Sequence, residues 1–207
     1  MSQTIAITKT SHQARSLLFS VAYYLFLTGG VLGLVYAGAA VLERHWYQAI
    51  EKARFENRSP GTAPAIPTEG SVLGRLEIPR LGMKVIVNEG VSDGVLRHAV
   101  GHIPQTALPG ERGNVALAGH RDTFFRPLRK IQTGDAIALR TPAGDFEYQV
   151  ESTFVVAPND VQVLEPSKER MLTLVTCFPF YYVGSAPNRF IVRARFVGPL
   201  PQQIEAR

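Results

Sequence analysis

The longest uninterrupted apolar stretch lies near the start of the chain, where residues 16–42 include no charged side chain. A helix of that length would measure roughly 40 Å at 1.5 Å per residue, which is enough to cross a bilayer with some tilt. The pattern therefore predicts a transmembrane helix over residues 16–42, preceded by a short tail over residues 1–15.

A cleaved signal peptide is the alternative interpretation of this segment, because Ala37-Gly38-Ala39 has the small-residue pattern of a cleavage site. The apolar stretch before it is nearer to about twenty residues than to the usual 7–15 of a signal sequence, so we expect an uncleaved anchor. Gly29, Gly33 and Ala37 recur every fourth residue, a spacing typical of helix-pairing faces, and allow weak self-association of the anchor.

The next segment, residues 43–70, is predicted to be a stalk and linker. Its first part, residues 43–58, is rich in charged side chains and suits a continuation of the helix. Residues 59–67, with the sequence SPGTAPAIP, suit neither helix nor sheet. This composition predicts a spacer between the membrane span and a folded domain.

From Val72 onward the pattern changes to short runs rich in Val, Ile, Phe and Tyr, separated by turn residues. Such runs predict β-strands, which we expect near residues 73–78, 84–87, 114–118, 135–140, 146–156, 171–176 and 189–197. Short helical pieces fit only near residues 93–100, 124–131 and 160–164. The domain over residues 71–198, followed by a polar tail over 199–207, is therefore mainly β. Seven or eight short strands favour a closed barrel, which has no exposed strand edges, although a sandwich fits the same pattern.

Composition and charge exclude two broad classes of protein. Hydrophobic residues make up 45% of the chain and charged residues only 19%, which describes a globular protein and not a disordered one. The net charge is +5, but from Ser71 onward 16 Lys and Arg stand against 13 Asp and Glu, a surplus of three. No basic run with interleaved aromatic residues is present, so we expect no nucleic-acid partner.

Three chemically complementary residues fall at the ends of predicted strands. Cys177, the only cysteine, ends one apolar run, His120 ends an earlier one, and Arg189 opens the last. A thiol, an imidazole and a fixed cation are the groups that acyl transfer through a thioester requires. We assign Cys177 as the nucleophile, His120 as the acid and base, and Arg189 as the group that stabilises the thiolate and the oxyanion.

Alternative roles exist for several of these residues. Cysteine is often simply a small buried apolar residue. Arg193 and Arg195 share strand parity with Arg189 and are the alternatives for its role. Asp122 is a candidate to orient the imidazole or to cap the turn that follows it, and Thr176 is expected beside the thiol as a secondary contact.

No metal or other cofactor is expected. His98 and His102 have the i, i+4 spacing of a helical metal pair, but a third ligand is missing nearby and residues 101–104 are typical of a turn. No cluster of carboxylates stands out as a calcium site. Phosphate-binding loops and nucleotide fingerprints are absent from the sequence as well.

Five segments occur in the order and spacing of a known family. They are GRLEIP from Gly74, LPGERGN from Leu108, AGHRDTFF from Ala118, TLVTC from Thr173 and NRFIV from Asn188. Over roughly residues 71–198 the chain resembles the sortases, which are membrane-anchored cysteine transpeptidases of the bacterial envelope. The sequence that surrounds the cysteine is most similar to class D, with class E as the second choice.

The resemblance implies an eight-stranded barrel in which Cys177 and Arg189 lie at neighbouring strand ends, with His120 opposite. It also implies a protein substrate with a C-terminal LPxT-like sorting signal, and an amine acceptor that is a peptidoglycan peptide or another protein. In sortases, the loops on either side of the cysteine-bearing strand line the substrate groove. In this chain those loops supply apolar side chains, namely Val161, Val163, Leu164, Phe180, Tyr181 and Tyr182.

Two other functions remain open from the sequence: a membrane-tethered cysteine peptidase that resolves the thioester with water, and an inactive barrel that only binds. We expect a single-pass protein of the plasma membrane with a cytoplasmic N-terminus and an extracytoplasmic catalytic domain, where a lone thiol has a use. The charges near the span favour the reverse orientation, because Lys9 and Arg15 precede it and more basic residues follow it, namely Arg44, Lys52, Arg54 and Arg58.

Overall fold

The computed structural model describes residues 3–56, 67–182 and 184–200. The chain divides into two compact units, Met1–Trp46 and Tyr47–Arg207. The first unit consists of helix, and the second contains a β-barrel, so the change of pattern along the sequence corresponds to a change of architecture.

Helix α1 (Gln3–Glu56) is continuous and includes the predicted span and the charged residues that follow it. Its stretch Phe19–Ala53 is long and apolar enough to cross a membrane. The most apolar part of this stretch has a mean hydropathy of 2.0, and none of that part is buried in protein. Phe26 and Leu34, for example, are 83% and 76% exposed. A helix with so much apolar surface and no protein core around it is suited to a bilayer.

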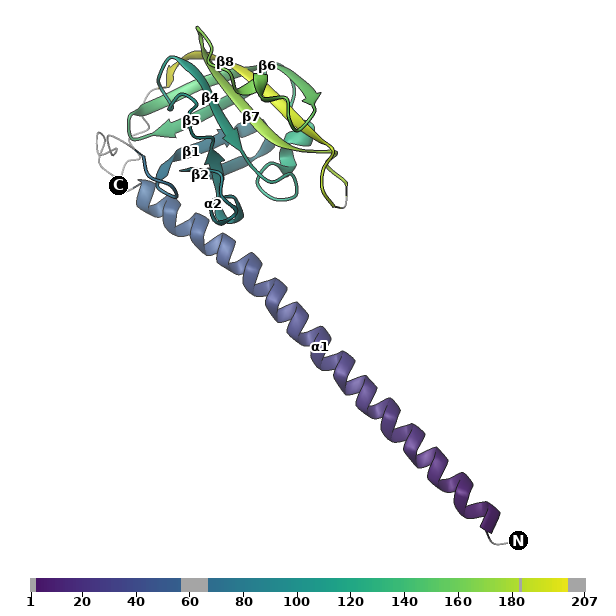
Figure 1. Ribbon diagram of the computed structural model, residues 1–207. Helices are drawn as coiled ribbons and strands as arrows, with labels where there is room; N and C mark the ends of the chain where they lie inside the picture. Colours follow the sequence, from purple (N-terminus) through teal and green to yellow (C-terminus); the bar gives the residue numbers. More distant parts are fainter. Residues whose placement is uncertain (1–2, 57–66, 183, 201–207) are drawn as a thin grey trace. The chain divides into compact units, whose positions relative to one another are not determined.

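Eight strands form a closed β-barrel in the described part of the chain (Figure 1). Around the barrel their order is β1-β2-β3-β4-β7-β8-β6-β5, and β5 closes onto β1. The prediction of a closed eight-stranded barrel is therefore confirmed. In chain order the strands are β1 (Val72–Ile78), β2 (Met83–Glu89), β3 (Val100–His102), β4 (Gly113–Ala118), β5 (Ala136–Thr141), β6 (Gly144–Val156), β7 (Arg170–Phe178) and β8 (Asn188–Leu200).

In the described residues the connections of the barrel carry short helical pieces, of which the first was not predicted and the other three lie close to where the sequence predicted them. These are η1 (Pro79–Leu81), α2 (Asp93–His98), η2 (Arg126–Lys130) and η3 (Val161–Leu164). The last strand, β8, runs to Leu200, past the expected start of a polar tail at residue 199. The remaining residues of that tail and residues 57–66 of the expected linker lie outside the described part of the chain.

The expectation of a turn over residues 101–104 is wrong, because His102 belongs to β3. Its side chain is only 1% exposed, with Nδ1 2.7 Å from Glu89 Oε2 and Nε2 3.0 Å from the carbonyl oxygen of Ala107. Gly101 is required in this strand, since a Cβ there would lie 2.2 Å from the carbonyl oxygen of Gly90. A three-residue strand built around glycine is too short to show an alternating pattern.

Alternate residues of each strand point into the barrel and form its core. In β7, for example, Leu172 and Leu174 are fully buried in the core cluster. The same alternation places Thr176 inward, at 2% exposure, and turns Cys177 to the outer face. The strand thus positions the thiol outside the core.

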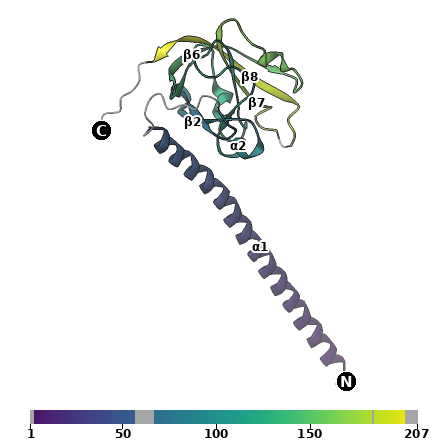
Figure 2. The ribbon, with the colours of Figure 1, turned by 60° about the vertical axis from the view of Figure 1, so that its left-hand side comes forward.

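Two of the strand pairs, β2–β3 and β4–β7, are parallel, whereas the others are antiparallel. Strands β4 and β7 pair in register from Gly113 with Arg170 to Ala118 with Val175. Because parallel strands run the same way, the segments that follow β4 and β7 leave the barrel at the same end. Strand β8 lies between β7 and β6 (Figure 2). Because β8 is antiparallel to β7, with Asn188 opposite Phe178, it starts at the end of the barrel where β7 stops.

Candidate active site

Cys177 and Arg189 face each other across the β7–β8 pair, as directly opposite residues in antiparallel register. His120 lines the same pocket, which has a volume of about 350 Å³. The thiol and the guanidinium are half-buried, and the imidazole is exposed. The structure therefore brings together all three residues to which the sequence analysis gave catalytic roles.

The parallel pairing of β4 with β7 brings the histidine to the cysteine. Ala118 pairs with Val175, so continuing that register by two residues brings His120 beside Cys177. The backbone N–H of Gly119 donates to the carbonyl oxygen of Val175 at 3.1 Å, which extends the pairing beyond the end of β4.

Thr176 supports the histidine from inside the barrel. Its hydroxyl donates to the carbonyl oxygen of Gly119 at 2.7 Å, and this bond is buried. Because Gly119 directly precedes His120, the bond ties the cysteine-bearing strand to the backbone next to the imidazole. The threonine was expected as a neighbour of the thiol, and its hydroxyl bonds the segment that carries the histidine.

Positive charge dominates the pocket. Arg121 and Arg189 both line it, and among the described lining residues Asp122 is the one carboxylate. Nη1 of Arg189 donates to the carbonyl oxygens of Ala186 and Asn188, at 3.3 and 3.0 Å. A cation held in this way can donate to an oxyanion. Asp122 is exposed, and its role in orienting the imidazole stays a prediction.

The six predicted groove residues have different environments in the two loops. Val163 is 9% exposed and belongs to the buried set, and Phe180 packs against Phe190 with ring centroids 5.3 Å apart. Leu164 is half-buried. The side chains with the most surface available to a ligand are Val161, Tyr181 and Tyr182, at 64%, 78% and 48% exposure. None of the six lines the pocket around the cysteine, so any groove for substrate extends beyond that pocket.

Two arginines between β4 and β5 contact the β7–β8 loop, residues 179–187, and the sequence analysis gave neither a role. Arg121 donates to three carbonyl oxygens of the loop, and Arg129 donates to the hydroxyl of Tyr181. Arg121 belongs to the GHRD segment of the family resemblance. Nothing in the sequence reports that its partners are backbone atoms about 60 residues away.

A buried network also supports the β6–β7 connection. Asn114 accepts a hydrogen bond from Thr173 at 2.6 Å and donates to the carbonyl oxygens of Val163 and Glu165, at 3.0 and 3.3 Å. Asn114 is 1% exposed and Thr173 is fully buried. Strands β4 and β7 thus fix the short helix η3, which carries three of the predicted groove residues.

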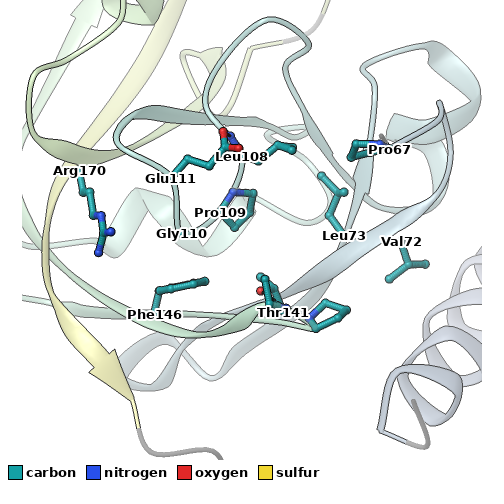
Figure 3. Close-up of a pocket in the computed structure, with 12 residues that line it drawn as sticks. Pro67, Val72, Leu73, Leu108, Pro109, Gly110, Glu111, Thr141, Phe146 and Arg170 are labelled. Atoms are coloured by element: carbon teal, nitrogen blue, oxygen red, sulfur yellow. Dashed lines mark hydrogen bonds between the residues drawn. The ribbon is translucent and has the colours of Figure 1, made fainter. Parts of the chain in front are cut away.

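A second pocket, of about 430 Å³, lies at the opposite end of the β4–β7 pair (Figure 3). Leu73, Pro109 and Phe146 give it apolar walls, and Arg170 lies at its side. Phe146 packs against Gly110, whose φ is +93° and where a Cβ would lie 2.4 Å from the ring. Because Arg170 begins the strand that Cys177 nearly ends, this pocket is separate from the candidate active site.

Comparison with known proteins identifies the family. A family model described as a sortase domain matches residues 76–197, which is more than half of the chain. The chain belongs to the sortase family. As a sortase it is a cysteine transpeptidase, and its partners are protein substrates with sorting signals and an amine acceptor.

Two curated relatives and one solved structure show the extent of the similarity. Sortase D of Bacillus subtilis is 37% identical over 152 residues, which cover 72% of this sortase and 71% of the relative. Sortase SrtE1 of Streptomyces coelicolor is 31% identical over 86% of this chain, which spans 57% of that protein. A Clostridium perfringens Sortase D5 transpeptidase is 31% identical, with a TM-score of 0.65 over 75% of this chain and 98% of that one. The interpretation as a class D sortase fits these findings.

Proposed function

We propose that this sortase cleaves an LPxT-like sorting signal after its threonine, holds the protein as a thioester on Cys177, and transfers it to an amine in the cell envelope. The observation that carries the proposal is the direct pairing of Cys177 with Arg189 in a pocket that His120 also lines. These are the three groups that the two halves of the reaction need.

In the first half-reaction the Cys177 thiolate attacks the carbonyl carbon of the threonine, and a C–S bond forms. Arg189 donates to the carbonyl oxygen while it carries negative charge. The C–N bond then breaks, and the His120 imidazolium gives its proton to the departing amine. The products are a thioester, a free amino terminus and a neutral imidazole.

In the second half-reaction an amine attacks the thioester carbonyl and loses a proton to the neutral His120. An amide bond forms, the C–S bond breaks, and the thiolate and imidazolium are restored. The acceptor in this proposal is a peptidoglycan peptide or another protein. The bilayer is the remaining partner, because helix α1 has the length and hydropathy to span it. The proposal places the barrel outside the cytoplasm.

The test uses the full-length chain in detergent micelles with a peptide that contains Leu-Pro-x-Thr. Amines that begin with glycine or alanine, and a diamino acid, are added in turn. We expect an amide-linked product by mass spectrometry and faster turnover in the presence of a suitable amine, because aminolysis removes the thioester.

Cys177→Ala serves as the control and should abolish cleavage, with residual activity below about a hundredth of wild type. If every amine leaves only the cleaved acid, while cleavage is rapid and depends on Cys177, the enzyme is a peptidase and the transfer step of the proposal is wrong.

A further inference from the structure

We propose that Arg121 is a positioning residue that fixes the β7–β8 loop against the segment that carries His120, and so shapes the substrate-binding side of the pocket. This inference rests on the proposed function. It begins with the position of the residue, because Arg121 directly follows His120 in sequence and lines the pocket with Cys177 and Arg189.

The side chain of Arg121 uses its guanidinium as a bridge between three backbone carbonyl groups. Nη1 donates to the oxygen of Pro179 at 3.1 Å, and Nη2 donates to the oxygens of Tyr182 and Gly184 at 2.7 and 3.0 Å. The guanidinium carbon also lies 5.8 Å from the centre of the Tyr182 ring. One side chain therefore bonds the loop at three points between Pro179 and Gly184.

The bridged loop forms one side of the pocket. Gly184, Ser185 and Ala186 line it together with the cysteine. The segment from His120 to Asp122, which carries the arginine itself, lines the same pocket. The bonds of Arg121 thus connect two of the segments that line the pocket, and they hold the loop in place beside the thiol.

A lysine cannot replace this arrangement. The guanidinium presents five N–H donors in a planar fork, whereas an ammonium presents three donors from a single atom. A lysine at position 121 would retain the positive charge but could not bond carbonyl groups on both sides of the fork. The bridge therefore depends on the geometry of the group and not only on its charge.

A second contact from the same connection supports the importance of this loop. Arg129 of η2 donates to the Tyr181 hydroxyl, and its guanidinium carbon lies 5.5 Å from the centre of that ring. This bond is exposed, as are the bonds of Arg121 to Tyr182 and Gly184, whereas the bond of Arg121 to Pro179 is partly buried. Because Arg121 makes three bonds to the loop, and solvent competes less with the partly buried one, Arg121 has the larger share in holding the loop.

The proposal predicts a change in substrate binding without a comparable change in chemistry. In Arg121→Ala and Arg121→Lys the loop should adopt the binding geometry in only a fraction of the molecules. The apparent dissociation constant for the peptide is the intrinsic one divided by that fraction, so the apparent affinity falls. We expect KM for the Leu-Pro-x-Thr peptide to rise about tenfold in both variants, with kcat within about twofold of wild type. Arg126→Ala, which changes an exposed arginine of η2, is the matched control and should leave both constants unchanged.

Hydrogen exchange provides a readout that does not depend on turnover. In full-length protein in micelles, peptic peptides that cover residues 178–188 should exchange faster in both Arg121 variants than in wild type and Arg126→Ala. If wild type does not cleave the peptide, the proposed function is wrong. Hydrogen exchange still tests whether Arg121 holds the loop in that case. Unchanged exchange and KM in both variants would overturn the proposal, and so would an Arg121→Lys variant that behaves like wild type in both.

Discussion

At the scale of single residues, the proposed reaction uses a cation, Arg189, that is already held in place by the protein. The guanidinium of Arg189 bonds the carbonyl oxygens of Ala186 and Asn188, and its backbone lies directly opposite Cys177. A donor that is held by its own strand end needs little rearrangement when negative charge develops on the substrate. The planar fork can serve the thiolate and the oxyanion together.

This geometry predicts that Arg189→Lys loses nearly as much activity as Arg189→Ala. Loss of one oxyanion donor costs about 10²–10³ in kcat, or about 2.7–4 kcal/mol, and a point charge does not reproduce the fork. The measurement is kcat for cleavage of the Leu-Pro-x-Thr peptide. Arg195→Ala is the matched control because Arg195 lies on the same strand but is exposed and donates to Gln149 at 2.7 Å. Full activity in Arg189→Lys would show that charge alone is enough.

The residue types in the sequence predicted the three catalytic candidates, but not the residues that hold the segments around them in place. Cys177, His120 and Arg189 stand out because a thiol, an imidazole and a guanidinium at the ends of predicted strands are chemically complementary and occur within a family pattern. Thr176 and Arg121 act through bonds to backbone carbonyl oxygens far away in sequence. A carbonyl oxygen is present at every residue, so the sequence has no signal for which one is the partner.

At the scale of elements, the β4–β5 connection carries the two arginines, Arg121 and Arg129, that contact the β7–β8 loop. This connection ends at Asp135, which is 7% exposed and bonds Arg80 of η1. The carboxylate also accepts a hydrogen bond from the backbone N–H of Gln132 at 2.8 Å, and Arg80 donates to the carbonyl oxygen of Lys130 at 2.5 Å. The pair therefore fixes the end of the connection to the barrel.

The ion pair between Arg80 and Asp135 makes the stability of the barrel depend on pH. The hydrogen bonds from the Arg80 guanidinium hold the pKa of Asp135 below its usual value of 3.8, against the opposing effect of burial. A carboxyl group with a depressed folded-state pKa contributes stability that is complete above the unfolded pKa and is lost as the pH falls through the folded pKa. We expect Asp135→Asn to cost about 1 kcal/mol at neutral pH. The difference from wild type should stay constant from about pH 7 to 5 and shrink below about pH 4.

Urea unfolding of the full-length chain in micelles at a series of pH values measures this dependence. Asp160→Asn is the control, since Asp160 is an exposed aspartate in the β6–β7 connection. A difference between Asp135→Asn and wild type that grows as the pH falls would contradict the sign of the pKa shift.

The pattern of the sequence predicted long strands better than short ones. Strands such as β6 and β7 carry enough alternating or apolar residues to be recognised, whereas β3 has three residues with glycine at the centre. The β3 pairing depends on the close approach of Gly101 to Gly90 and on the buried bonds of His102. Both are tertiary contacts, and a local pattern does not report them.

At the scale of the whole molecule, the sequence and the proposed function disagree about which side of the membrane holds the barrel. The basic residues around the span favour a cytoplasmic barrel by the positive-inside rule. The proposed transfer to an amine acceptor in the cell envelope favours the opposite side. Folded domains cross the membrane largely regardless of their charge. We therefore expect the barrel outside.

Cys177 itself allows a direct test of the orientation, because it is the only cysteine in the chain and is half-buried at the surface. In intact cells that produce the full-length protein, a membrane-impermeant maleimide should label Cys177 without permeabilisation, because the thiol then faces the medium or the wall space. The measurement is the mass of the purified protein. In a Cys177→Ala background, Ser11→Cys places the thiol in the N-terminal tail and should react only after the membrane is opened. If the two proteins react in the opposite order, the barrel is cytoplasmic, the charges near the span have decided the topology, and an envelope acceptor for this enzyme is ruled out.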